Sequence, residues 1–334
     1  MKLDICSVGN AIVDVQFSIN EDFISKLQSK SIPKGSMTLV ELKEQKDLIE
    51  LLKQKHEEPI LACGGSVTNA IIASASFGSK CHVACKVSND EHGNFFLEDL
   101  TTNKINHSVI ATKSNLPTGR CLVMVSEDAE RTMCTYLGIS NDLTEEDIDI
   151  KAIQASKYLF IEGYLVASTS ALKACNTAIK AAKKSNTKVA ISLSAAFIAN
   201  SFKAELKSLI DLRCDLLLCN ESEALVYTDC KNLEEAEKKL RNVSFCNLIT
   251  LGKEGCLAWD GYKLAHINGY KANAIDTNGA GDMFAGAVLN FLSEERGLNT
   301  AARFGCFAAS KKVESFGPRL SPKEYQKIKL EFKY

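Results

Sequence analysis

The stretch from Asn278 to Asp282, in the sequence TNGAGD, combines a glycine-rich turn with a carboxylate. An apolar helix is expected to begin near Ala280. The backbone N–H groups of Gly279, Ala280 and Gly281 would then lack intrahelical partners and could bind a phosphate. An acid beside a bound anion repels it, so Asp282 makes sense there if it accepts a proton from a hydroxyl that attacks the phosphorus. The alternative is that Asp282 only favours the helix dipole, and these residues alone do not decide between the two.

A second glycine turn, CGGSVTN, also precedes an expected helix. Gly64 and Gly65 would let a ligand approach the backbone closely, and Asn69 would offer that ligand both a donor and an acceptor. This combination suits a polar, uncharged ligand. Because no GKS or GKT follows, the turn is a poor match to a phosphate-binding loop, and a tight turn capped by Asn69 is the alternative.

Polar residues also follow the first expected strand, in SVGNAIVD. A buried strand rarely delivers residues such as Asn10 and Asp14 to a sheet end unless they have hydrogen-bonding partners. The hydroxyl groups of a sugar would supply such partners. Capping of the local loop is the alternative.

The sequence CNESE directly follows another buried run. Asn220 and Glu223 lie three positions apart, so they share one face if a helix begins here. An amide and a carboxylate near a phosphate suit Mg²⁺ and its water shell. A helix start whose acids favour the dipole is the alternative.

Two further features are less specific. In ITLGKEG, Thr250 and Gly252 end a strand and Gly255 permits a second turn, which could hold a nucleotide, although any strand-to-hairpin turn looks similar. Arg120 and Arg131 lie in an expected hairpin, from which an arginine could neutralise charge on a polyphosphate. For Arg131, a solvated surface position is the preferred interpretation.

The elements that must position these residues follow from the apolar pattern. Short runs typical of buried strands alternate with longer runs of helical period, the strands being LDICSVG, CHVACKV, KYLFIEG, KVAISLS, CDLLLCN and CNLITLG. This alternation predicts an α/β fold with a doubly wound, mostly parallel sheet and helices on both faces. Ligands of such folds bind beyond the carboxyl ends of the strands, where the polar turns fall. Two helices, 280–296 and 299 to about 313, are expected to end the chain.

Two passages break the alternation. One contains IVDVQFSI and KGSMTLV, and the other pairs GRCLVMVSE with ERTMCTYLG around the turn EDAE. We expect a single domain, 1–334, in which two insertions, about 13–40 and 113–138, pair into a small β-sheet that forms a lid over the strand ends. An edge extension of the main sheet is the alternative.

Composition excludes some functions and partners. A net charge of −1 gives no bulk attraction to nucleic acid or to an anionic membrane, and 46% apolar residues suffice for a sizeable core. The 13 cysteines lie mostly in apolar runs and form neither CxxC nor a zinc pattern, which indicates buried, reduced thiols. Asp4 and Gly9 interrupt the first apolar run, so we expect no signal peptide, no membrane span and a cytoplasmic protein, monomer or homodimer.

Taken together, the order and spacing of these motifs resemble the ribokinase-like (PfkB) carbohydrate kinases over nearly the whole chain. The segment GGSVTNAIIASASFGSKCHVACKVSNDEHG resembles the family's amino-terminal signature, and DTNGAGDMFAGAVLNF resembles the carboxyl-terminal one. Within the family, the adenosine kinase group and its bacterial homologues are the most similar, through GNAIVDV, KGSMTLV, TGRCLVMV, ERTMCTYLG, ISLSAAF and CNESEAL. Many bacterial relatives carry an acid within this segment, which LSAAF lacks. The eukaryotic adenosine kinases lack that acid too.

The resemblance implies an α/β core with a β lid and transfer of the ATP γ-phosphoryl group to a primary hydroxyl, assisted by Mg²⁺. The implied roles are Asp282 as catalytic base; Gly279, Ala280 and Gly281 as anion hole; Asn10, Asp14, Gly64, Gly65, Asn69 and, from its neighbourhood only, Arg120 in the acceptor site; Asn220, Thr250, Gly252, Gly255 and Asn278 around the nucleotide; and Glu223 near the metal.

The implied acceptor is a ribonucleoside, adenosine first, with a sugar such as ribose or fructose as the alternative. Two other classes of protein are alternatives to a kinase. A nucleoside-binding module without transfer would gain nothing from the repulsion between Asp282 and a bound anion. A nucleotide-dependent oxidoreductase should carry G-x-G-x-x-G after the first strand and an acid about 20 residues later, and both are missing.

Overall fold

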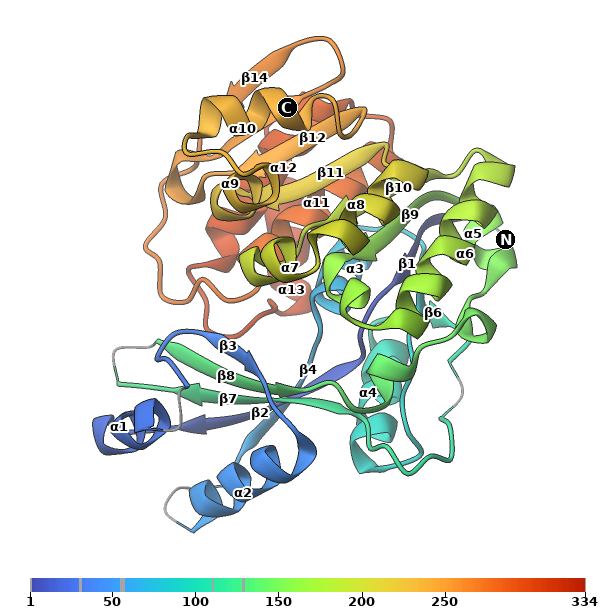
Figure 1. Ribbon diagram of the computed structural model, residues 1–334. Helices are drawn as coiled ribbons and strands as arrows, with labels where there is room; N and C mark the ends of the chain where they lie inside the picture. Colours follow the sequence, from blue (N-terminus) through green and yellow to red (C-terminus); the bar gives the residue numbers. More distant parts are fainter. Residues whose placement is uncertain (1, 30–31, 55–57, 110, 128–129, 334) are drawn as a thin grey trace.

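The computed structural model describes residues 2–29, 32–54, 58–109, 111–127 and 130–333, which form two β-sheets flanked by helices (Figure 1). The larger sheet has nine strands in the order β14-β13-β12-β11-β10-β9-β1-β5-β6. Neighbouring strands are parallel except in the pairs β12–β13 and β13–β14. The bounds are β1 Leu3–Val8, β5 Cys81–Ala84, β6 Asn106–His107, β9 Ser156–Glu162, β10 Lys188–Ser192, β11 Leu216–Asn220, β12 Cys246–Thr250, β13 Cys256–Trp259 and β14 Leu264–Ile267. The predicted doubly wound, mostly parallel α/β sheet is confirmed.

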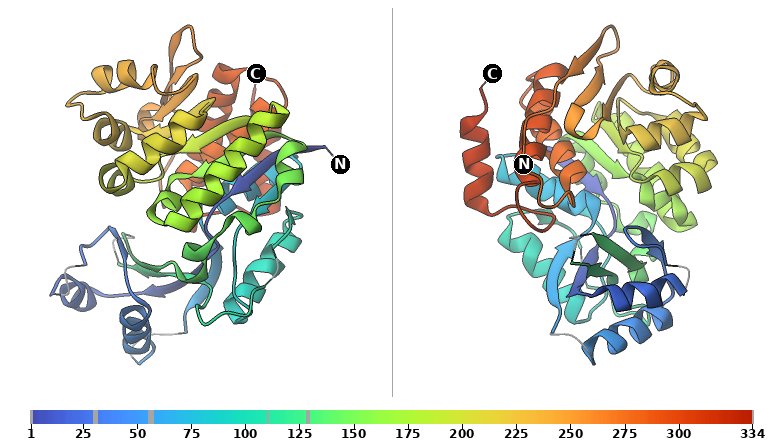
Figure 2. Two further views of the ribbon diagram at one scale, coloured as in Figure 1. Left: turned by 45° about the vertical axis from the view of Figure 1, so that its right-hand side comes forward. Right: turned by 90° about the vertical axis from the view of Figure 1, so that its left-hand side faces the viewer.

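Helices cover both faces of this sheet, as the right-hand view of Figure 2 shows. Successive strand residues point to opposite faces, so Ile5 belongs to one apolar cluster while Cys6 and Val8 belong to the other. One face packs against α3 Ser66–Ser76, α4 Glu91–Thr102, α11 Ala280–Ser293, α12 Leu298–Lys312 and α13 Pro322–Glu331. The other packs against α5 Ile150–Gln154, α6 Thr169–Ser185, α7 Ala196–Ser201, α8 Lys203–Leu212, α9 Glu221–Thr228 and α10 Leu233–Leu240.

The carboxyl-terminal region holds one more helix than the sequence analysis predicted. Helices α11 and α12 lie close to their expected positions, but α13 was missed. Its start carried a readable signal, because Ser321 and Glu324 form a capping box around a proline at the first turn. Tyr325 of this helix packs its ring edge-on against Phe77 at the end of α3.

The second sheet has the strand order β3-β8-β7-β2-β4 and is separate from the main sheet rather than an extension of its edge. Its strands are β2 Ile12–Ser18, β3 Met37–Leu39, β4 Ile60–Gly64, β7 Gly119–Val125 and β8 Arg131–Tyr136. The two passages that break the strand–helix alternation meet where β2 pairs in parallel with β7. The sequence analysis did not predict that β4 belongs to this sheet. Helices α1 Glu21–Ser29 and α2 Leu42–Lys53 pack on one face of this sheet (Figure 1). Its movement as a lid stays a prediction.

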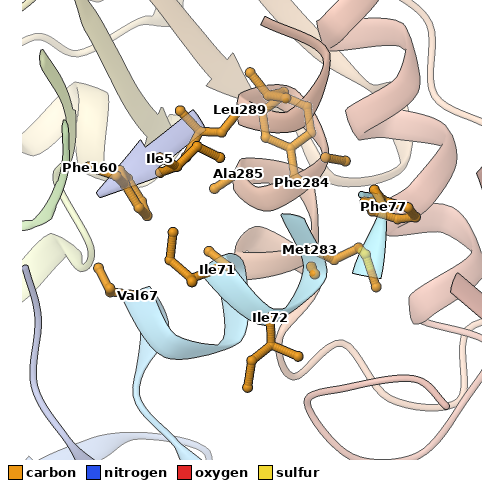
Figure 3. Close-up of a cluster of buried hydrophobic side chains, with 14 of the residues drawn as sticks. Ile5, Val67, Ile71, Ile72, Phe77, Phe160, Met283, Phe284, Ala285 and Leu289 are labelled. Carbon is orange, nitrogen blue, oxygen red and sulfur yellow. The ribbon is translucent and has the colours of Figure 1, made fainter. Parts of the chain in front are cut away.

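Helices α3 and α11 pack against each other in the core and set the geometry of the strand-end region. In Figure 3, Ile71 of α3 lies towards Ala285 of α11, and both belong to the same buried apolar cluster. Gly286 makes the approach possible, since a Cβ added there would lie 2.2 Å from the carbonyl oxygen of Ala70. The first turns of the two helices are therefore held close together.

Within the described ranges, none of the helices has the length and apolar character that crossing a membrane requires.

Candidate active site

Asp282 lies in the first turn of α11, and the first turn of α3 fixes its carboxylate. Ser66 Oγ donates a hydrogen bond to Oδ1 at 2.6 Å, and Asn69 Nδ2 donates to Oδ2 at 2.9 Å. Burial raises the pKa of Asp282, and both hydrogen bonds oppose that shift because they favour the ionised form. The side chain is thus held in one orientation with its charge partly stabilised, as a proton acceptor requires.

The glycine turn before Asp282 presents two of the three donors expected. Gly279 is the N-cap of α11, with a φ of 74°. The N–H of Ala280 donates to the carbonyl oxygen of Thr277 at 3.1 Å, so the prediction that Ala280 is a free donor was wrong. Over the described part of the chain, no hydrogen-bond acceptor is found for the N–H groups of Gly279 and Gly281. These two groups remain available to an anion.

A first cavity, of about 260 Å³, opens beside Asp282 and is lined by both polar and apolar residues. The predicted site residues that line this first cavity are Asn10, Asp14, Gly65, Asn69, Gly279, Gly281 and Asp282, joined by Asn278, which was expected at the nucleotide instead. Gly64 does not line the cavity. A Cβ on Gly64 would lie 2.5 Å from Oδ1 of Asp14, so this glycine makes room for the Asp14 side chain.

Two polar residues that hold the cavity together were missed from the sequence. Glu162, at the end of β9, accepts hydrogen bonds from Asn10 N at 2.7 Å, Asn10 Nδ2 at 2.8 Å and Val67 N at 3.0 Å. Arg319 Nε donates to Asn69 Oδ1 at 2.7 Å. The strand KYLFIEG ends in an acid at the same sheet edge as the other sites, which was a usable signal for Glu162. No local pattern marks Arg319.

Burial raises the pKa of Asp14 to about 7, although Arg319 and Arg131 oppose the shift. In the unfolded chain this carboxyl titrates near its ordinary 3.8. The folded protein therefore binds the proton more tightly, and stability is lost as the pH rises from about 4 to about 7.

We expect Asp14→Asn, free of ligands, to gain thermal stability over the wild type, and to gain more at about pH 8 than at about pH 5. Thermal unfolding at the two pH values measures this. Asp260→Asn is a matched control, because backbone hydrogen bonds lower the pKa of exposed Asp260, so its difference from wild type should be the same at both pH values. An equal difference for Asp14→Asn as well would mean that Asp14 is already ionised in the folded protein at the lower pH.

A second cavity, of about 330 Å³, lies on the other side of the α11 start. As expected, Thr250, Gly252 and Gly255 line it. Gly252 begins a short 3₁₀ helix, Gly252–Glu254, that directly follows β12 and Leu251. Gly281 lines both this cavity and the first one, so the helix start lies between the two.

Asn220 and Glu223 form the capping box of α9. Asn220 Oδ1 accepts from Glu223 N at 2.8 Å, and the Glu223 carboxylate accepts from Asn220 N at 3.1 Å and Nδ2 at 2.8 Å. Burial raises the pKa of Glu223 to about 7. Both residues also line a small cavity that reaches Asp282, so the capping role and a role beside phosphate are compatible.

The side chains near Glu223 determine what kind of metal ion could bind here. Across the described residues there is no group of three or more His, Cys, Asp or Glu side chains that could cage a metal. Mg²⁺ commonly takes only one or two protein carboxylates and completes its shell with water and phosphate oxygens. Glu223 therefore fits a magnesium ion carried by a phosphorylated ligand.

The two hairpin arginines lie elsewhere than expected. Arg120 and Cys121 are neighbours in β7. Cys121 lines the first cavity, while Arg120 points to the opposite face of the sheet, so Arg120 does not lie with the other residues predicted for the acceptor site. Arg131 is buried rather than solvated. It forms an ion pair with Asp276 at 2.6 Å and lies over the ring of Phe316, which ties the second sheet to the loop before Gly279.

Known proteins are similar to this chain in sequence and in fold. Residues 36–324 match the family described as pfkB family carbohydrate kinase. A ribokinase from Staphylococcus aureus (strain COL) is 30% identical over 266 residues, which cover 77% of this chain and 84% of that protein. An adenosine kinase from Schizosaccharomyces pombe is 26% identical, covering 79% of this chain and 84% of the relative.

Among solved structures, an adenosine kinase from Sinorhizobium meliloti superposes with a TM-score of 0.89 at 28% identity, covering 98% of this chain and 99% of the other. These matches confirm the resemblance derived from the motifs. With a glycine-flanked carboxylate between two cavities and a match over most of its length, the chain belongs to the pfkB family of carbohydrate kinases.

Proposed function

We propose that this kinase transfers the γ-phosphoryl group of ATP to the primary hydroxyl of a ribonucleoside, with adenosine as the first candidate. The family covers both ribokinases and adenosine kinases among the relatives, so the choice of acceptor rests on the cavity itself.

The observation that carries the nucleoside assignment is the apolar part of the lining of the first cavity, which we propose as the acceptor cavity. Besides polar residues, this lining includes Met37, Leu39, Met133, Leu137, Tyr164, Phe197 and Ile198. A ribose ring would satisfy the polar residues, but a free sugar has no group for the apolar and aromatic ones. A planar base fits them, because aromatic and aliphatic side chains stabilise flat, weakly polar rings.

The proposed chemistry follows from the positions of three groups. Asp14 accepts hydrogen bonds from ribose hydroxyls, which orients the primary hydroxyl towards Asp282. Asp282 accepts the proton of that hydroxyl as the bond to phosphorus forms. The N–H groups of Gly279 and Gly281 stabilise the charge on the transferring phosphoryl group. Since such transition states are loose, the proton can leave late and Asp282 need not be a strong base.

The second cavity is the proposed ATP site. Thr250, Gly252 and Gly255 would hold the nucleotide, and Glu223 would face the Mg²⁺ that accompanies its phosphates. When bound, Mg²⁺ neutralises charge on the phosphate oxygens. Because Asp14 belongs to the second sheet, closure of that sheet as a lid would bring Asp14 onto the acceptor and exclude water. We expect a monomer or homodimer that needs no macromolecular partner.

A coupled ADP-release assay with MgATP, run over nucleosides and free sugars, tests the acceptor. We expect adenosine or a close analogue to give the highest kcat/KM. A much higher kcat/KM for ribose or fructose would establish the sugar alternative, which the 30% identity to a ribokinase supports.

Phe197→Ala makes this test specific to the apolar lining of the cavity. Loss of one aromatic wall should raise KM for the nucleoside by about tenfold, equivalent to about 1.4 kcal/mol, and leave any KM for ribose unchanged. Phe245→Ala is the matched control, because Phe245 is exposed and lines neither cavity. An equal rise for both acceptors would show that Phe197 supports the fold of the cavity rather than contacting a base.

A further inference from the structure

Two cysteines from distant parts of the chain are in contact at the wall of the second cavity. Cys256 begins β13 and Cys306 lies within α12, and their sulfur atoms are 3.7 Å apart. A disulfide bond needs about 2.05 Å. The two sulfur atoms must therefore approach by about 1.7 Å for the bond to form.

The two thiols differ in exposure and acidity. Cys256 is fully buried, whereas Cys306 is 7% exposed and lines the second cavity together with Thr250 and Gly255. The adjacent Cys256 thiol can donate to a Cys306 thiolate and lowers the pKa of Cys306. By contrast, burial raises the pKa of thiols such as Cys175. Because thiolates react with oxidants, Cys306 is the more reactive partner.

We propose that Cys256 and Cys306 form a redox modification site, at which a small peroxide entering the second cavity converts the two thiols to a disulfide. The Cys306 thiolate attacks one oxygen of the peroxide, so that an S–O bond forms, the O–O bond breaks and, with hydrogen peroxide, water leaves. Cys256 then attacks the Cys306 sulfur, an S–S bond forms, and the hydroxyl leaves as a second water. Two thiols are oxidised by two electrons and the peroxide is reduced by two.

The consequence for activity rests on the proposed function, in which this cavity holds ATP. Cys306 belongs to the cavity wall, and Cys256 directly follows Gly255 of the nucleotide turn. A disulfide would draw the wall towards the turn and weaken nucleotide binding, while the acceptor cavity keeps its shape. Bound nucleotide would in turn cover Cys306 and slow the reaction.

Peptide mapping after oxidation tests the site without any assay of activity. The folded full-length protein is treated with hydrogen peroxide, remaining thiols are alkylated in denaturant, and the protein is digested with trypsin. Cleavage after Lys253, Lys263, Arg303 and Lys311 isolates each cysteine in its own peptide, 254–263 and 304–311. We expect these two peptides to appear joined, lighter than their sum by two hydrogen atoms, and to separate on reduction with dithiothreitol.

Cysteine variants test whether the joined peptide comes from a bond between Cys256 and Cys306. Cys306→Ser and Cys256→Ser should each abolish the joined peptide, while Cys230→Ser, which removes a more exposed thiol at the end of α9, should not. Peroxide treatment that oxidises other cysteines without joining 254–263 to 304–311 would overturn the proposal, as would a link that survives in Cys306→Ser.

A parallel reaction with MgATP separates this proposal from the assignment of the cavity. At about tenfold above its Kd, the nucleotide leaves about a tenth of the sites open, so the link should form about tenfold more slowly. An unchanged rate with a clear link would uphold the redox site and contradict the placement of ATP in this cavity.

Discussion

Asp282→Asn should reduce kcat for phosphoryl transfer by about 10²–10⁴-fold, the range typical of losing a general base. The amide has nearly the shape of the carboxylate but cannot take the proton of the attacking hydroxyl. The variant should still fold and bind ATP, because Asp282 belongs to neither the nucleotide turn nor the apolar stripe of α11. Nucleoside-dependent ADP release measures kcat, and calorimetric titration with ATP measures binding.

The local hydrogen bonds set the expected cost in stability. Ser66 can still donate to the amide oxygen, but Asn69 would face an NH₂ group, and Arg319 holds the oxygen of Asn69 so that this amide cannot reverse freely. One hydrogen bond is lost, worth about 1 kcal/mol of unfolding free energy. Glu91→Gln removes an exposed carboxylate from the first turn of α4 and controls for the helix-dipole effect. Turnover close to wild type in Asp282→Asn would reject the base assignment.

Gly281→Ala should lower kcat/KM by about 10²–10³-fold while leaving the protein at least as stable. The backbone N–H stays, but the added methyl group would keep the phosphoryl group away from it, with an effect similar to loss of a preorganised oxyanion donor. A Cβ on Gly281 meets no heavy atom within 4 Å, and alanine is favoured over glycine inside a helix by about 0.5–1 kcal/mol. Because Gly281 lines both cavities, we expect the added methyl group to occupy the path of the phosphoryl group.

Gly279→Ala is the contrasting variant. Gly279 has a φ of +74°, and a Cβ there would lie 2.3 Å from the carbonyl oxygen of Pro318. It should lose stability and activity together. Thermal unfolding beside steady-state kinetics separates the two cases, and a Gly281→Ala enzyme with normal kcat/KM would show that phosphate does not pass this backbone.

Residues whose neighbours are close in sequence were predictable. The turn TNGAGD starts α11 because glycines and an acid are suited to a helix N-terminus, and the strand-end turns converge because parallel strands share one carboxyl edge. The capping alternative for Asn220 and Glu223 was equally local, and the structure contains that cap.

The predictions that were wrong concerned residues whose positions depend on contacts between distant segments of the chain. Arg131 looked solvated because its partner, Asp276, lies 145 positions away. Arg120 was misplaced because its side of β7 is set by the packing of the α1 and α2 helices on the second sheet. The cavity contacts of Leu137 and Phe197 were not predicted either. Both residues lie in segments that carry the family resemblance, ERTMCTYLG and ISLSAAF, but only the fold brings these segments to one cavity.

The most direct test of the account is to identify the phosphorylated product. The enzyme is incubated with MgATP and adenosine, and the products are examined by proton-coupled ³¹P NMR. We predict a new phosphate monoester whose phosphorus couples to the two protons of the 5′ carbon, formed in step with ADP and almost absent with Asp282→Asn. ADP accompanied only by inorganic phosphate, or a phosphate on a ring hydroxyl, would contradict transfer to a primary hydroxyl activated by Asp282.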